Sequence, residues 1–133
     1  MNTPVAHLPP SDGRRFAMEV QDVPRATVLA LAGELDHDTA EPVRRALDAA
    51  LRRGGRLLVD VSRLDFCDST GLNLLLHSRM AFGEASAEGV GAGSLELVGL
   101  RQPVARMFHL TGADRLFRIH PDVAAALAAP RHT

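Results

Sequence analysis

The sequence predicts one α/β domain with a mixed sheet of about five strands, mostly covered by four helices. Its 133 residues and 46% hydrophobic content suit a single ordered core. Two apolar segments in direct succession near the start favour an antiparallel hairpin. The later apolar segments alternate with segments of helical periodicity, which favours parallel strands. The predicted order is therefore β-β-α-β-α-β-α-β-α.

The hairpin strands are expected at residues 15–20 and 26–35, joined by a turn over residues 21–25 in which Pro24 breaks the strand. The second strand is almost continuously apolar, which is typical of a central strand covered on both faces. Residues 1–14, which precede the hairpin, contain three prolines and a glycine, so we expect a flexible tail there.

The first helix is expected from about Thr39 to Arg53, because apolar residues recur there at helical spacing. Asp38 or Thr39 would cap its start, and the pair of glycines that follows Arg53 would end it. Residues 56–61 are apolar and include β-branched side chains, as expected of the next buried strand.

The second helix is expected to begin at Asp68 or Ser69, either of which could be its N-cap, and to continue to about Ala81. Residues 82–93 contain four glycines, so they are interpreted as a connecting loop.

The C-terminal part is expected to contain two strands and two helices. One strand would lie around residues 95–98, followed by a short helix that Pro103 opens and Gly112 ends. Residues 116–119 can form the last strand and residues 121–129 a closing helix. The domain would thus span residues 15–129, and residues 130–133 would form a short tail.

Composition excludes several classes of partner. With 15 basic and 16 acidic residues, the chain has no general attraction to nucleic acid or to an anionic membrane. No segment approaches the roughly 18 apolar residues of a membrane span. The single cysteine, Cys67, excludes an internal disulfide and predicts a reducing compartment, by default the cytoplasm. The six histidines lack metal-ligand spacing, so neither a metal site nor a cofactor is expected.

Ser69 is the candidate functional residue, because it follows a buried strand at the position where open α/β sheets present functional groups. A serine at a helix start is often only a cap, although Asp68 could cap equally well, so both interpretations stay open. A Ser-His-acid triad is disfavoured. Ser69 lacks the Gly-x-Ser-x-Gly elbow, and His77 lies about 12 Å further along the same helix. His109 and His120 lie in segments with structural explanations of their own.

Two other motifs are weaker candidates. The glycine run over residues 89–94 precedes a strand and is not followed by a lysine, so it does not predict a phosphate-binding loop. Cys67 lies just before a helix, where a thiol can be acidified, but its apolar neighbour Phe66 favours a packed and inert side chain.

The stretch Asp65-Phe66-Cys67-Asp68-Ser69-Thr70-Gly71-Leu72, preceded by Val59-Asp60-Val61-Ser62, strongly resembles the phosphorylation loop of STAS domains, specifically of bacterial anti-sigma factor antagonists. Residues 31–36 are similar to that family's second strand and its exit. Its C-terminal signature is matched by Leu97-Val98-Gly99-Leu100, Val104, Met107, Leu110-Thr111-Gly112 and Leu116-Phe117. The resemblance covers about residues 15–129. Cys67, Asn73 and the long connector depart from the pattern.

The resemblance implies a STAS-type fold in which Ser69 accepts a phosphoryl group from a partner anti-sigma factor, with Thr70 as the less favoured acceptor. That partner is itself a serine kinase with a histidine-kinase-like ATPase fold. The unphosphorylated antagonist would bind the kinase and free the sigma factor, and a metal-dependent serine phosphatase would reverse the modification. The residues expected to bind the partner are Asp36, Asp65, Asp68, Ser69, Thr70, Gly71 and Leu72. The chain would then be a regulator of bacterial stress response or sporulation, not an enzyme.

Physical chemistry is consistent with such a switch. Phosphorylation adds about −1.5 to −2 charges at a helix N-terminus, where the helix dipole accepts an anion, so the penalty should fall on the partner interface. Two alternatives stay open: a STAS scaffold or sensor module that is never phosphorylated, and a small-ligand or nucleotide-binding domain.

Overall fold

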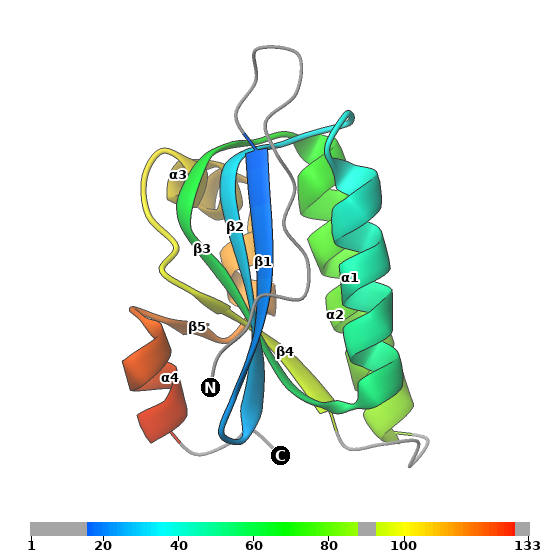
Figure 1. Cartoon of the computed structure of the whole chain (residues 1–133). Helices are drawn as coiled ribbons and strands as arrows, with labels where there is room; N and C mark the ends of the chain where they lie inside the picture. Colours follow the sequence, from blue (N-terminus) through cyan, green and yellow to red (C-terminus); the bar gives the residue numbers. More distant parts are fainter. Residues whose placement is uncertain (1–15, 88–92, 130–133) are drawn as a thin grey trace.

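The computed structural model describes residues 16–87 and 93–129 and contains one five-stranded sheet (Figure 1). The strands are β1 (Phe16–Val23), β2 (Ala26–Leu35), β3 (Gly55–Cys67), β4 (Gly93–Val98) and β5 (Ile119–His120). Their order in the sheet is β1-β2-β3-β4-β5. β1 runs antiparallel to β2, whereas the other neighbouring pairs are parallel. The helices are α1 (Ala40–Arg53), α2 (Ser69–Ala87), α3 (Val104–Thr111) and α4 (Val123–Ala128). This order confirms the predicted mixed α/β fold.

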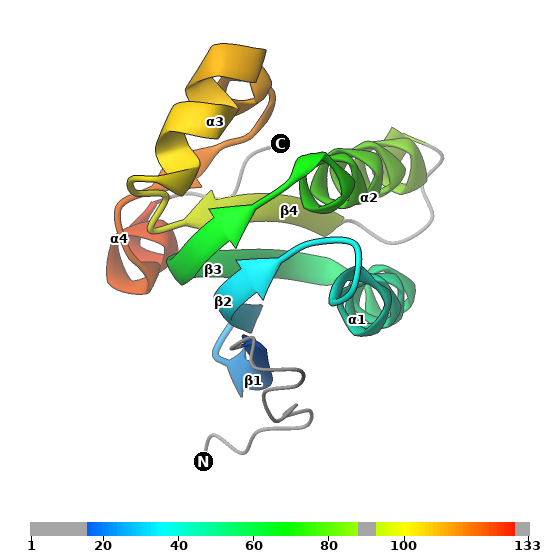
Figure 2. The same ribbon diagram turned by 90° about the horizontal axis from the view of Figure 1, so that it is seen from above.

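Both faces of the sheet are covered. Successive strand residues point to opposite sides, so each central strand contributes side chains to two separate cores. Helices α1 and α2 lie together on one side and α4 lies on the other (Figure 2). The main core includes Leu57 and Val59 of β3, while Leu58 between them belongs to a second, smaller core. That second core consists of Val28, Leu58, Val98 and Ala126. Burial on both faces explains why β2 is nearly continuously apolar and why β3 is apolar from Leu57 to Val59.

The opening hairpin is tighter than the sequence predicted. The ladder between β1 and β2 continues to the pair Val23 and Ala26, so only Pro24 and Arg25 form the turn instead of residues 21–25. Arg25 has a φ of 71°, the left-handed conformation that a type II turn with proline at its first central position requires of its second central residue. The prediction that Pro24 ends the first strand was therefore right, but β1 continues up to the residue before it.

Strand β3 is longer than the predicted residues 56–61. Val61, Leu64 and Cys67 are all buried, at a spacing of three that a regular strand cannot place on one face. The pairing with β2 shifts register between Ala30 and Ala32 and again between Gly33 and Glu34. Each shift places an extra residue in β3, and these two bulges keep the apolar residues turned toward the core.

Helix α2 is also longer than predicted, since it continues past Ala81 to Ala87. Phe82, which we assigned to a loop, is buried in the main core. A single glycine inside a helix costs only about 1 kcal/mol relative to alanine, so burial of Phe82 outweighs Gly83. Residues 88–92, which hold most of the predicted glycine run, lie outside the described residues.

The C-terminal third follows the prediction with one change. Gln102 and Pro103 precede α3, and Gly112 ends that helix in the left-handed conformation. Residues 113–116 form a 3₁₀ turn, so the last strand is reduced to Ile119 and His120. Asp122 caps α4 by accepting a hydrogen bond from the Ala125 N–H at 2.7 Å. The predicted tails, residues 1–14 and 130–133, lie outside the described residues. Within the described ranges, no helix combines the length and apolarity needed to cross a membrane.

Candidate functional site

The candidate site lies where β3 gives way to α2. The Asp68 N–H donates to the Leu35 carbonyl oxygen at 3.1 Å, which continues the pairing with β2 for one further residue. The Asp68 carbonyl accepts the first helical hydrogen bond from the Leu72 N–H at 2.9 Å, and its Oδ1 accepts from the Gly71 N–H at 3.0 Å. Asp68 is therefore the N-cap, and Ser69 is the first residue inside the helix.

Asp68 also joins the helix start to the loop between β2 and α1. Its second carboxylate oxygen, Oδ2, accepts from the His37 N–H at 3.3 Å. That loop is tightly bonded within itself, since Asp36 Oδ1 accepts from the Asp38 N–H at 2.9 Å and from the Thr39 N–H at 3.2 Å. The Thr39 hydroxyl donates to the Glu34 carbonyl at 2.8 Å. The loop and the start of α2 thus form one connected surface.

Gly71 allows the first turn of α2 to lie directly on the core. A Cβ atom at this position would meet Leu35 Cγ at 2.7 Å and Cys67 Sγ at 3.0 Å. Such contacts are shorter than van der Waals packing permits, so only glycine fits without a displacement. Leu72 follows and is buried in the main core. These two residues hold the helix start in place.

The side chains that flank this anchor face solvent. Ser69 and Thr70 are exposed, and in the described part of the chain the Ser69 hydroxyl has no hydrogen-bond partner. Asp65 is exposed and lies 3.7 Å from Arg101 Nη2 as an ion pair. Phe66 is 48% exposed, although a phenyl ring of this size is usually buried. Both an apolar ring and an unbonded hydroxyl are thus exposed within four residues of the chain.

The structure divides the seven predicted partner-binding residues into two groups. Asp65, Ser69 and Thr70 are exposed, and Asp68 is half-buried. Asp36, Gly71 and Leu72 are buried, so they support the site from beneath its surface. The sequence analysis missed Phe66 and His37 as surface residues of the site. For Phe66 the available signal was its place next to Asp65, in a segment that also contains Arg63 and Asp68 and is too polar for a core strand.

Cys67 is packed, as predicted. It is buried, its Sγ lies 3.6 Å from the Asp68 carbonyl oxygen, and burial together with the nearby Asp68 charge raises the pKa of the thiol to about 12. The thiol is therefore protonated and inert at neutral pH.

The histidines considered for a triad are occupied elsewhere. His109 lies 3.1 Å from Asp114, and His120 is buried against Glu96 at 2.8 Å. Over residues 16–87 and 93–129, no cluster of His, Cys, Asp or Glu is arranged to hold a metal ion.

A mixed sheet, two helices on one face and an exposed serine directly after the N-cap of α2 together define a class of protein. Residues 18–119 match the model of a family described as Mlab, STAS domain, and the chain belongs to the STAS domain family.

Among its relatives is the anti-sigma-F factor antagonist RsfB of Mycobacterium tuberculosis, with 31% identity over 87% of this chain and 90% of that protein. A solved anti-sigma factor antagonist from Mycobacterium paratuberculosis has a TM-score of 0.74 and 27% identity, covering 92% of this chain and 99% of that one. The Bacillus cell fate determinant SpoIIAA, solved in its phosphorylated form, has a TM-score of 0.63 and 25% identity, covering 84% of this chain and 96% of that one.

Proposed function

We propose that this protein is an anti-sigma factor antagonist whose unphosphorylated form binds an anti-sigma factor serine kinase in the cytoplasm and thereby releases the sigma factor. Phosphorylation of Ser69 switches this binding off, and a metal-dependent serine phosphatase restores it. The observation that carries the proposal is the exposed Ser69 hydroxyl, which lacks a hydrogen-bond partner among the described residues and stands on a rigid helix start. The antagonists among its relatives support the same role.

The position of Ser69 suits a modification that leaves the fold intact. At the first position of α2 a phosphate would lie near free backbone N–H groups and the positive end of the helix dipole. Because Asp68 supplies the cap, the helix does not depend on the Ser69 hydroxyl. The added charge therefore changes what the surface can bind more than it changes the stability of the domain.

The same charge would oppose a partner that packs closely on this surface. The half-buried Asp68 already contributes negative charge next to Ser69, whereas Asp65 is paired with Arg101. A dianion added there must be desolvated when the partner covers the helix start, and the adjacent Asp68 carboxylate gives no compensation. Loss of kinase binding after phosphorylation follows from this local electrostatic cost.

Transfer would form a bond between Ser69 Oγ and the γ-phosphorus of ATP while the bond from that phosphorus to the ADP oxygen breaks. The hydroxyl proton leaves to a base of the kinase, which also binds the ATP and its Mg²⁺. On this proposal the chain contributes the acceptor hydroxyl and a fixed geometry, so it is the substrate and not the enzyme.

Substitution of the acceptor tests the proposal. In an assay with the anti-sigma factor kinase that co-purifies with the chain, Ser69→Ala should take up no phosphate and should bind the kinase constitutively. Thr70→Ala is the matched control, because it removes a neighbouring exposed hydroxyl and should be phosphorylated as the wild type is. Full phosphate incorporation in Ser69→Ala would show that another residue is the acceptor. A wild-type protein that binds the kinase but is never phosphorylated would indicate a scaffold.

A charged replacement tests the separation of fold from recognition. Ser69→Glu should weaken kinase binding while the far-UV circular dichroism spectrum and the melting temperature stay close to wild type, because the helix dipole accepts the charge. An unfolded Ser69→Glu protein would contradict this separation.

A further inference from the structure

The opposite end of the molecule from Ser69 holds an open pocket of about 350 Å³. Its walls come from the β1–β2 turn and from the junction between α1 and β3. Three of the lining residues are arginines: Arg25 of the turn, Arg53 at the end of α1, and Arg56 at the start of β3. β3 thus has this pocket at its amino end and the Ser69 surface at its carboxyl end.

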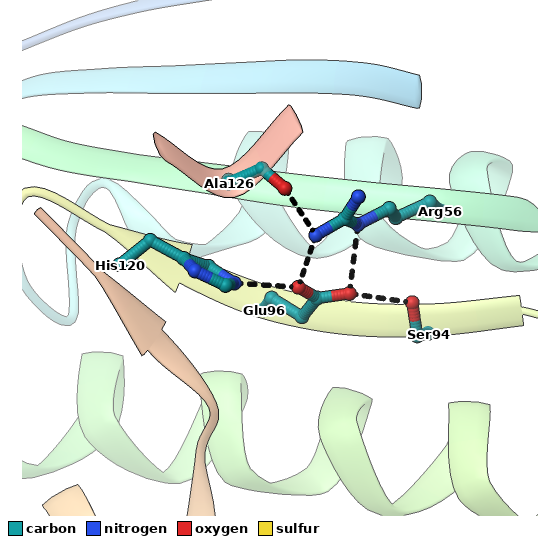
Figure 3. A network of polar contacts seen from close by, with 5 residues as sticks. All are labelled: Arg56, Ser94, Glu96, His120 and Ala126. Carbon is teal, nitrogen blue, oxygen red and sulfur yellow. Dashed lines mark hydrogen bonds and ion pairs between the residues drawn. The ribbon is translucent and has the colours of Figure 1, made fainter. Parts of the chain in front are cut away.

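Arg56 is a buried cation held in one orientation. Its side chain is only 6% exposed. Its Nε donates to Glu96 Oε2 at 3.0 Å, and its Nη2 donates to Glu96 Oε1 at 2.8 Å and to the Ala126 carbonyl at 2.7 Å (Figure 3). Glu96 also lies 2.8 Å from His120 Nε2 and accepts from the Ser94 hydroxyl at 2.9 Å. The guanidinium plane is therefore fixed before any ligand arrives.

One nitrogen of this guanidinium, Nη1, remains available. It has no bonding partner within the described part of the chain, and in Figure 3 it points away from Glu96. Among the described residues, no completely buried polar side-chain atom lacks a hydrogen-bond partner, so Nη1 must reach the surface. Arg56 is one of the residues that line the pocket.

The charges around the pocket favour an anion. The lining contains three arginines and one acid, Asp22, whose Oδ1 lies 3.0 Å from Arg53 Nη2, and Arg56 is itself paired with Glu96. The C-terminal end of α1 adds about half a negative charge, which Gly54 partly satisfies by donating its N–H to the Ala50 and Leu51 carbonyls. Arg53 and Arg56 are each paired with a carboxylate, so the excess of positive charge comes from Arg25. Arg25 is exposed and has no partner in the described ranges.

We propose that this pocket binds a small phosphate-bearing anion between Arg25, Arg53 and the free Nη1 of Arg56. Guanidinium groups match the oxygens of a phosphate in geometry as well as in charge, and a preoriented one loses little entropy on binding. The ligand would displace Arg53 from Asp22 and stabilise the folded protein without touching the Ser69 surface. The site is independent of the function proposed for Ser69.

Titration with inorganic phosphate at constant ionic strength tests the site, with calorimetry for affinity and ¹⁵N-labelled protein for location. We expect saturable binding below about 10 mM phosphate. The amide signals of Gly54 and Gly55 and the Arg56 guanidinium signal should shift. No saturation in this range would overturn the proposal. It would equally be overturned if the shifts were confined to Ser69 and Thr70 at the start of α2.

Charge variants sharpen the test. Arg25→Gln and Arg53→Gln should each weaken phosphate binding about threefold to tenfold. Asp22→Asn should strengthen it, because it removes the opposing charge and releases Arg53. Arg52→Gln is the matched control, since Arg52 is an exposed arginine in the same helix turn but does not line the pocket. Equal weakening in Arg52→Gln would show a general charge effect and overturn the site.

The source of the phosphate group is distinguished by comparing ligands. Glycerol phosphate that binds more tightly than inorganic phosphate would identify an organic phosphate ester as the preferred ligand, and the reverse order would identify the free ion. Acetate that binds as tightly as either would overturn the assignment of phosphate chemistry.

Discussion

At its amino end β3 carries Arg56, whose bonds to Glu96 and Ala126 are buried under α4, whereas at its carboxyl end it leads to Asp68 and the exposed Ser69. Both ends are polar and both are anchored by a carboxylate. At the amino end the Glu96 carboxylate is bonded to side chains, and Arg56 also donates to the Ala126 carbonyl of α4, so these polar groups hold the C-terminal helix. At the carboxyl end the carboxylate binds backbone N–H groups and leaves a neighbouring hydroxyl unbonded.

This difference separates stability from recognition. A buried ion pair is costly to break, because the remaining charge has no solvent to compensate it. A capped helix start can exchange one exposed side chain for another at little cost, because the cap and the buried residues beneath it are unchanged. We therefore expect large losses of stability at the amino end of β3 and large losses of binding at its carboxyl end.

The largest effect is expected for Arg56→Met, which leaves Glu96 buried without its main partner. The free energy of unfolding in urea should fall by about 3–5 kcal/mol. Arg44→Met is the control, because Arg44 forms only exposed pairs with Glu41 and Asp48, and it should cost no more than about 1 kcal/mol. The double variant Arg56→Met, Glu96→Met should recover much of the loss. Equal costs for the two single variants would contradict the comparison.

Acid should weaken the same end of β3 through Glu96. Burial alone would raise the pKa of this carboxyl, but hydrogen bonds from Arg56, His120 and Ser94 outweigh it and lower the pKa from 4.5 to about 2. The folded state thus binds this proton less readily than the unfolded state. The contribution of Glu96 to stability is complete above the unfolded pKa and is lost as the pH falls between about 5 and 2.

Glu96→Gln should therefore be less stable than wild type at neutral pH, and its unfolding free energy should fall less steeply between about pH 5 and pH 2. Urea denaturation at several pH values measures both slopes. Parallel curves for the two proteins would show that Glu96 does not carry the acid sensitivity.

A smaller effect is expected for Gly71→Ala at the carboxyl end. The added Cβ would collide with Leu35 and Cys67, so we expect a loss of about 1–3 kcal/mol and slower phosphorylation of the displaced Ser69. Gly83→Ala in the same helix is the control, since its Cβ would meet only the Arg79 guanidinium at 3.5 Å. That variant should be neutral or more stable by up to about 1 kcal/mol. If Gly83→Ala were as destabilising as Gly71→Ala, the loss could not be assigned to the contacts of Gly71 with the core.

The smallest effect on stability is expected for Asp68→Asn, which keeps a capping oxygen but removes the charge. Its unfolding free energy should change by less than about 1 kcal/mol. Kinase affinity or phosphorylation rate should fall severalfold, because the bond to His37 and the local negative charge both weaken. Asp48→Asn, whose side chain on α1 is 47% exposed, should leave both unchanged. Wild-type binding and phosphorylation in Asp68→Asn would restrict Asp68 to a capping role.

The sequence predicted the fold where a local pattern decides it. Hydrophobic periodicity identified α1, and glycine and proline marked the ends of α3. It failed where distant residues decide. The length of β3 depends on bulges opposite β2, and the length of α2 depends on burial of Phe82 in the core. Neither feature has a signal within a few neighbouring residues.

The site shows the same limit. The motif identified Ser69 and Asp68, since capping chemistry is local. It did not reveal that Asp36 is buried, because its bonds to Asp38 and Thr39 depend on the conformation of the loop. Arg56 and Glu96 lie 40 residues apart and meet only because β3 and β4 are neighbours. The available signal was that each of two predicted buried strands contains a charged residue, and buried charges of opposite sign are usually paired.

The packing of Cys67 gives the protein a reporter of its own motion. The thiol is buried beneath Gly71, so we expect a reagent to reach it when the first turn of α2 lifts from the core. Cys67 is the only cysteine in the chain, so its alkylation rate measures that opening without engineered labels. A kinase that binds the closed surface should slow the labelling, and a partner that first pulls the helix start open should accelerate it.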